Sequence, residues 1–220
     1  YIVMPDLLAT TQQALESLDT LCKAAKGTVK SLVSKDGRIS SGLMEQHQAA
    51  AHGLSWLATY HESMRQMQNW ATKLTEAGDF GEAEQLLHQI ACGEYHAQIV
   101  GGIPMSQGEI VRLSDIKIPA AAQQDYQNAA VMNLIANGNT QAARTRLVEL
   151  MQEQAGNVIF GASGLDEELE MIREQFRRFS VDKVEPHAHE WHLNDELIPM
   201  EIIEELAELG VFGLTIPEEL

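Results

Sequence analysis

Apolar side chains recur at helical spacing along most of this 220-residue chain, and the periodicity predicts an all-α fold. Near the end of the chain, Leu165, Leu169, Ile172, Phe176 and Phe179 follow one another at alternating steps of four and three residues. This spacing places them on one face of a helix, which must pack against another element. Only 6 prolines interrupt such patterns. We therefore predict a bundle of packed helices.

The pattern divides into two predicted regions, a helical extension at residues 1–160 and the incomplete start of a second helical domain at residues 161–220. The extension contains about five predicted helices. They cover residues 5–34, 41–77, 79–100, 120–136 and 140–154. Residues 156–164 contain three glycines, Gly156, Gly161 and Gly164, so we interpret this segment as the linker between the regions.

Residues 103–119 form the longest stretch without helical period. Residues 110–113 are predicted to form one short strand or extended chain. A loop of this length inside a compact domain is usually functional or packed across an interface. We hypothesise that the extension packs as a bundle against a larger body, with residues 101–119 at the contact.

The second region is predicted to contain two helices. Proline lacks an amide proton, so Pro186 is expected to end the first of them. The second is expected to open at Pro199 and to end at Gly210, which can adopt the left-handed capping conformation.

Two segments of the extension are alike, residues 74–79 and residues 134–139, and each is followed by an alanine-rich helix. One interpretation is a helical-repeat module that binds other proteins and has no enzymatic activity. The other is that two helical hairpins use similar turns. We favour the second interpretation because stable arrays need about three repeats.

The net charge of −17 argues against nucleic acid and anionic membranes as partners. Residues 161–220 carry 16 acidic and 4 basic groups, so most of the negative charge lies in the second region. No apolar run approaches the length of a membrane span. We expect a cytoplasmic location.

No motif of nucleophilic, dinucleotide-binding or phosphate-binding chemistry occurs, so we predict no catalytic and no cofactor-binding residue in this chain. Cys22 and Cys92 stand alone within helical patterns and are interpreted as buried thiols of a reducing compartment.

The spacing of the histidines predicts no metal site. His187, His189 and His192 do not share one helical face and are interpreted as exposed loop residues. His47 and His61 lie on the apolar stripe of the second helix and are interpreted as core or interface residues. A di-iron bundle would need Glu-x-x-His pairs, which are absent from the sequence.

The second region carries a further pattern, made of Val184, Pro186, Glu190, Trp191, Pro199, the run 206–210, Gly213 and the run 217–219. It resembles the start of the N-terminal helical domain of flavin-dependent acyl-CoA dehydrogenases, and it covers about a quarter of the chain. Two departures bear on substrate subtype, because His192 and the pair Leu197 and Ile198 stand where the family more often has Asp and Phe.

The resemblance implies an FAD enzyme in which a glutamate removes the α-proton of an acyl-CoA and the β-hydride passes to the flavin. Electrons then go to electron-transferring flavoprotein. The flavin site and the glutamate belong to later parts of such proteins, so this segment is expected to be structural and inactive alone. An extension of some 160 residues is unusual in the family. Its run 101–107 resembles the extension of a member that oxidises a short branched acyl-CoA. Downstream domains of the same chain and further copies of it are the implied partners.

Overall fold

The computed structural model describes residues 2–156 and 160–217, and their helical content confirms the predicted all-α class. The chain forms two compact units, Tyr1–Gly164 and Leu165–Leu220, called unit 1 and unit 2 below. No helix among the described residues is both long and apolar enough to cross a membrane.

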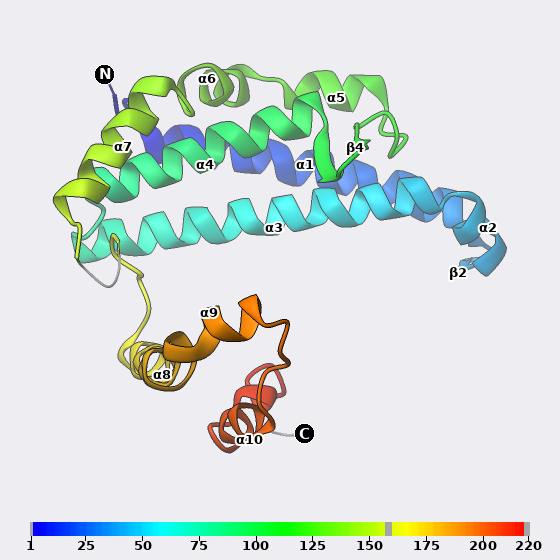
Figure 1. Ribbon diagram of the computed structural model, residues 1–220. Helices are drawn as coiled ribbons and strands as arrows, with labels where there is room; N and C mark the ends of the chain where they lie inside the picture. Colours follow the sequence, from blue (N-terminus) through cyan, green and yellow to red (C-terminus); the bar gives the residue numbers. More distant parts are fainter. Residues whose placement is uncertain (1, 157–159, 218–220) are drawn as a thin grey trace. The chain divides into compact units, whose positions relative to one another are not determined.

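Three long helices organise unit 1, and they lie alongside one another (Figure 1). They are α1 (Leu7–Val33), α3 (Gln48–Ala77) and α4 (Glu82–Gly101). Shorter helices complete the bundle: α2 (Ser41–Gln46), α5 (Ala120–Tyr126), α6 (Ala129–Asn137) and α7 (Gln141–Glu153). The largest buried cluster gathers apolar side chains from α1, α3, α4 and α6, including Leu18, Leu57, Ile99 and Leu134.

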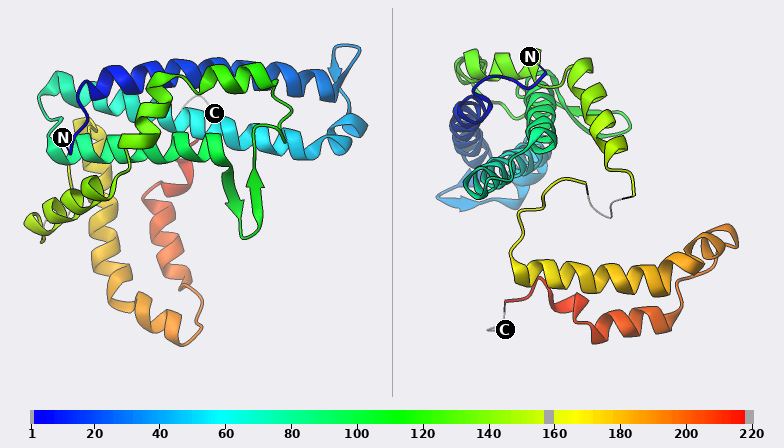
Figure 2. Two further views of the ribbon diagram at one scale, coloured as in Figure 1. Left: turned by 90° about the horizontal axis from the view of Figure 1, so that it is seen from above. Right: turned by 90° about the vertical axis from the view of Figure 1, so that its left-hand side faces the viewer.

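Two antiparallel hairpins join the helices. Strands β1 (Ser34–Lys35) and β2 (Arg38–Ile39) turn through Asp36 and Gly37, which both have positive φ, as a two-residue hairpin turn requires. Strands β3 (Ile103–Ser106) and β4 (Glu109–Val111) form a second hairpin, which extends away from the long helices (Figure 2, left). The sequence predicts one short strand here, and the structure pairs it with a second.

Three predicted boundaries are wrong. The helix predicted at 41–77 is broken at His47, whose φ of −114° and ψ of 23° are not helical, so α2 and α3 are separate. The helix predicted at 120–136 is also two helices, because Asn128 accepts hydrogen bonds from the N–H groups of Ala130 and Val131 and caps α6. The next helix after Gly78 begins at Glu82 rather than at Asp79.

The two similar turns differ in conformation. Gly78 ends α3 in the left-handed region with φ of 81°, whereas Gly138 has φ of −75°. Glycine is needed at position 138 because the backbone there lies directly against Gly93 of α4. A Cβ on Gly93 would lie 2.7 Å from Asn139 N and 2.8 Å from Leu134 O. The likeness of residues 74–79 and 134–139 therefore does not reflect one repeated structural unit.

Unit 2 consists of α8 (Glu167–Phe179), a π-helical turn η1 (Ser180–Val184), α9 (Glu185–Leu193), α10 (Met200–Glu208) and a short 3-10 turn η2 (Val211–Gly213). Asp166 caps α8 by accepting from the N–H of Leu169. As predicted, α10 follows Pro199 directly, and Gly210 follows α10 with φ of 80°.

The prediction that Pro186 ends the helix is wrong. Helix α8 leads through η1 directly into α9, which contains Pro186 in its first turn. The widened turn resolves the steric conflict, since the N–H of Glu185 donates to the carbonyl of Ser180, five residues back. Pro186 lacks the N–H that would continue this ladder, and it stands directly after the π-helical turn.

Unit 2 has no buried residue within its described part, residues 165–217. Helices α8 and α10 are nevertheless amphipathic, and large apolar side chains remain open to solvent. Leu169 is 47% exposed, Ile203 37% and Phe212 64%. The faces that the spacing predicts are present, but nothing within the described residues of unit 2 covers them fully.

The contact between Gly93 and Gly138 generates a paired prediction. Gly93→Ala should destabilise unit 1 by about 1–3 kcal/mol, because the new Cβ meets backbone atoms that cannot move away cheaply. Gly27→Ala in α1 meets nothing within 4 Å and should instead stabilise the helix by about 0.5–1 kcal/mol. Urea unfolding followed by helical circular dichroism measures both. Equal effects of the two substitutions would contradict the close packing.

Candidate docking groove and buried polar network

The aperiodic segment 103–119 packs one side into unit 1. Ile103 and Val111 of the hairpin are buried. So are three apolar residues of the loop that follows, Leu113, Ile116 and Ile118. Gly53 of α3 permits this approach, since a Cβ there would lie 2.9 Å from side-chain carbons of Val111 and Ile116. Only the other side of the segment is available to a partner.

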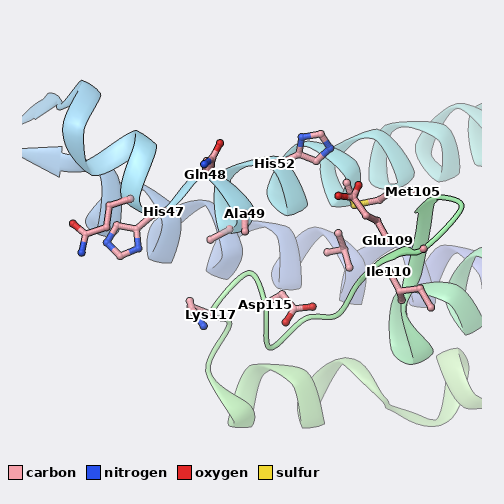
Figure 3. A pocket seen from close by; sticks show the side chains of 13 residues that line it. His47, Gln48, Ala49, His52, Met105, Glu109, Ile110, Asp115 and Lys117 are labelled. Atoms are coloured by element: carbon pink, nitrogen blue, oxygen red, sulfur yellow. The ribbon is translucent and has the colours of Figure 1, made fainter.

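That other side borders a groove of about 830 Å³. One wall comes from the junction of α2 and α3, and the opposite wall comes from the hairpin and the loop (Figure 3). The charged side chains are of both signs, with Glu109 and Asp115 against Lys117. Apolar surface comes from Met105 and Ile110, and Ile110 is 50% exposed. A mixed lining of this kind is typical of surfaces that bind other proteins, whereas a pocket for an acyl chain is lined mostly by apolar side chains.

Two histidines lie on the α2–α3 wall of the groove. His47 occupies the break between the helices. His52 accepts a hydrogen bond at Nε2 from the indole N–H of Trp56, at 2.9 Å, so its proton is on Nδ1. His47 and His61 are half-buried rather than core residues, and His61 Nε2 lies 3.5 Å from the carboxylate of Asp19.

A network of buried polar side chains, which the sequence analysis did not identify, lies on α4. His88 is fully buried, and its Nε2 lies 3.1 Å from both Thr11 Oγ1 of α1 and Gln68 Oε1 of α3. Thr11 donates its own hydroxyl proton to the carbonyl of Leu7, and Gln68 Oε1 can only accept. His88 Nε2 is therefore the donor. The sulfur of Cys92 lies 3.9 Å from the Nδ1 atom of His88.

Gln89, the next residue, ties the start of the chain to the turn after α6. Its Oε1 accepts from the N–H of Met4 at 2.7 Å. Its Nε2 donates to the carbonyls of Ile2 and Gly138, at 3.0 and 3.1 Å. All three bonds join segments that are far apart in the sequence.

His96, two turns further along α4, binds α5. Its Nδ1 lies 2.5 Å from the hydroxyl of Tyr126, and both residues are buried. Its Nε2 is buried without a hydrogen-bond partner among the described residues. Burial lowers the pKa of His88 and the pKa of His96 to about 4, because an imidazolium would lose its hydration there.

The network does not supply a nucleophile. Cys22 and Cys92 are free and buried, as predicted, and burial raises the pKa of each thiol to about 12. A thiol in that state is not ionised near neutral pH and does not react readily.

Histidines of unit 2 are exposed, as predicted, but they lie on a helix rather than in a loop. His187, His189 and His192 all belong to α9, and His187 stacks on Trp191 with ring centroids 5.6 Å apart. In residues 2–156 and 160–217, no group of three or more His, Cys, Asp or Glu side chains is arranged to hold a metal ion.

Comparison with known proteins supports the resemblance found in the sequence. Residues 166–220 match the family described as acyl-CoA dehydrogenase, N-terminal domain. The chain is also 57% identical over 217 residues to a (2S)-methylsuccinyl-CoA dehydrogenase from Cereibacter sphaeroides. That match covers 99% of this chain and 39% of the relative, so the chain spans well under half of the relative's length. The resemblance to acyl-CoA dehydrogenases is thereby confirmed, and it extends through unit 1.

The buried histidines predict how stability changes with pH. In the unfolded chain they bind protons near pH 6.5, whereas in the folded chain they do so only near pH 4. The contribution of each buried histidine to the free energy of unfolding is therefore complete above about pH 6.5. It decreases as the pH falls toward 4, by roughly 2 kcal/mol per histidine between pH 7 and pH 5. Urea unfolding at several pH values measures the slope. His88→Gln should flatten it, and the exposed control His189→Gln should leave it unchanged. An unchanged slope in the first variant would contradict the assignment.

Proposed function

We propose that this chain is the N-terminal part of an FAD-dependent acyl-CoA dehydrogenase. Its substrate is (2S)-methylsuccinyl-CoA or a similar short branched acyl-CoA, and electron-transferring flavoprotein takes the electrons. The identity of 57% to a (2S)-methylsuccinyl-CoA dehydrogenase along nearly the whole chain supports the choice of substrate. The family match at residues 166–220 supports the reaction class.

The observation that carries the proposal is the state of unit 2. Asp166 caps α8, and α8 and α10 are amphipathic, yet no residue in 165–217 is buried. Such faces are stable in water when another layer covers them. We propose that the downstream domains of the same protein supply that layer.

We propose that the flavin is bound by residues outside this segment. The groove of unit 1 is lined by a mixture of charged, polar and apolar side chains. A hollow along α8 in unit 2 is lined mainly by charged residues, including Arg173, Glu174, Arg178 and Asp182. Neither offers the largely apolar enclosure that an isoalloxazine ring requires. The role proposed for this segment is therefore structural, and we assign no catalytic step to its residues.

Unit 1 is proposed to dock onto the catalytic body or onto a neighbouring subunit through the hairpin β3–β4. The hairpin extends away from the long helices (Figure 2, left), and Ile110 is exposed at the edge of the groove described above. An exposed apolar residue within a polar rim is the usual composition of an interface centre.

The enzymatic proposal is tested with the full-length protein. We expect a yellow protein that contains FAD and oxidises (2S)-methylsuccinyl-CoA faster than straight-chain acyl-CoA substrates. The 220-residue segment alone should be colourless and inactive. Flavin absorbance and single-substrate turnover assays measure both expectations. Turnover by the segment alone, or a full-length protein without flavin, would refute the proposal.

The docking role is tested by a matched pair of surface substitutions in the full-length protein. Ile110→Asp places a charge at the proposed contact and should weaken it by about 1–3 kcal/mol. Ile39→Asp is the control, because Ile39 is 70% exposed on the other hairpin. Thermal unfolding and light scattering measure the effect on assembly. The hairpin has no docking role if both variants behave like the unsubstituted protein.

A further inference from the structure

The last part of the predicted linker, residues 160–164, packs against the helices of unit 1 as the end of that unit, and it is called the strap below. Phe160 packs against a small apolar cluster made of Ala83, Leu86, Ala143 and Leu150 from α4 and α7. The earlier linker residues 157–159 lie outside the described residues. The strap itself contacts side chains of α3 and α4.

Ala162 is held on both sides of its backbone. Its N–H donates to Glu84 Oε1 of α4 at 2.7 Å. Its carbonyl accepts from the indole N–H of Trp70 of α3 at 3.1 Å. Both polar groups of one residue are thus satisfied by side chains that lie 78 and 92 positions away in the sequence.

The flanking glycines fit this arrangement closely. Gly161 has φ of 74°, and a Cβ there would lie 2.9 Å from Glu84 Oε1. Gly164 has φ of 70°, and a Cβ there would lie 3.2 Å from Trp70 Cδ1. Each position needs both a left-handed backbone and the absence of a side chain. These glycines therefore serve a fixed geometry, whereas their composition alone suggests flexibility.

The two side chains that hold the strap are themselves fixed. Glu84 is only 7% exposed, and it lies in the first turn of α4, where the helix dipole favours its negative charge. Trp70 packs edge-to-face on Phe80, with ring centroids 6.2 Å apart. Phe80 in turn packs on the buried His88 at 6.1 Å. Glu84 and Trp70, called the clamp below, are thus continuous with the core of unit 1.

We infer that Glu84 and Trp70 form a receptor for the strap, so that the chain leaves unit 1 at a fixed point rather than through a flexible tether. Only one residue, Leu165, lies between Gly164 and Asp166, which caps α8. The connection between the docked strap and the first helix of unit 2 is therefore very short. This inference rests on contacts within unit 1 and is independent of the proposed enzymatic activity.

The test is hydrogen exchange of the strap amides in the 220-residue chain and in the full-length protein. Glu84→Gln keeps the shape but removes the charge, and exchange at Ala162 should become about ten- to a hundred-fold faster. Trp70→Phe removes the indole donor and should accelerate it about two- to ten-fold. Limited proteolysis between residues 155 and 165 should increase in parallel.

Two control variants make the same chemical changes at other positions, both of them on α3. Glu76→Gln alters an exposed carboxylate, and Trp56→Phe removes an indole donor that binds His52. Neither should change exchange in the strap. If Glu84→Gln does not fold, Trp70→Phe decides alone. The inference is overturned if the Ala162 amide is unprotected in the unsubstituted protein, or if both clamp variants keep full protection.

Discussion

Unit 1 depends on the buried polar side chains of one helix, α4. His88 binds α1 and α3, Gln89 binds the N-terminal segment and the turn after α6, and His96 binds α5. Apolar burial is non-directional, so it can hold several arrangements of helices at similar free energy. A buried hydrogen bond has a required distance and angle, and leaving it unmade costs about 1–3 kcal/mol. These three residues therefore help to fix which neighbours α4 can have, and Gly93 lets one of them, α6, approach closely.

Local signals in the sequence predict local structure well. Asp36 and Gly37, Gly78, Pro199 and Gly210 all lie at turns or helix ends, because the backbone preference of each residue acts at its own position. The amphipathic stripe of α8 was also predictable from spacing alone. The helix breaks at His47 and Asn128 were not predictable, because the helical spacing of apolar residues continues across both positions. His47 has a non-helical backbone, and the side chain of Asn128 caps a new helix.

The buried network and the strap lie beyond such predictions for a different reason. His88 is polar, so a search for periodic apolar residues does not include it. Its partner Thr11 is 77 positions away in the sequence. The strap contains glycines, which composition assigns to a flexible linker, while Trp70 and Glu84 stand in helices with no local hint of their role. Tertiary partners decide the structure at these positions.

The two units differ in whether they have a buried core. Unit 1 has its own core, and among the described residues His96 Nε2 is the one buried side-chain nitrogen or oxygen atom without a hydrogen-bond partner. Unit 2 has ordered helices without a core and most of the negative charge of the chain. The apolar side chains of unit 1 cover one another, whereas those of unit 2 remain open to solvent, which supports the proposal that a further layer packs on unit 2. In the inferred arrangement, Glu84 and Trp70 hold the backbone of Ala162, four residues before the cap of α8. This asymmetry between the two units agrees with the structural role proposed for the extension.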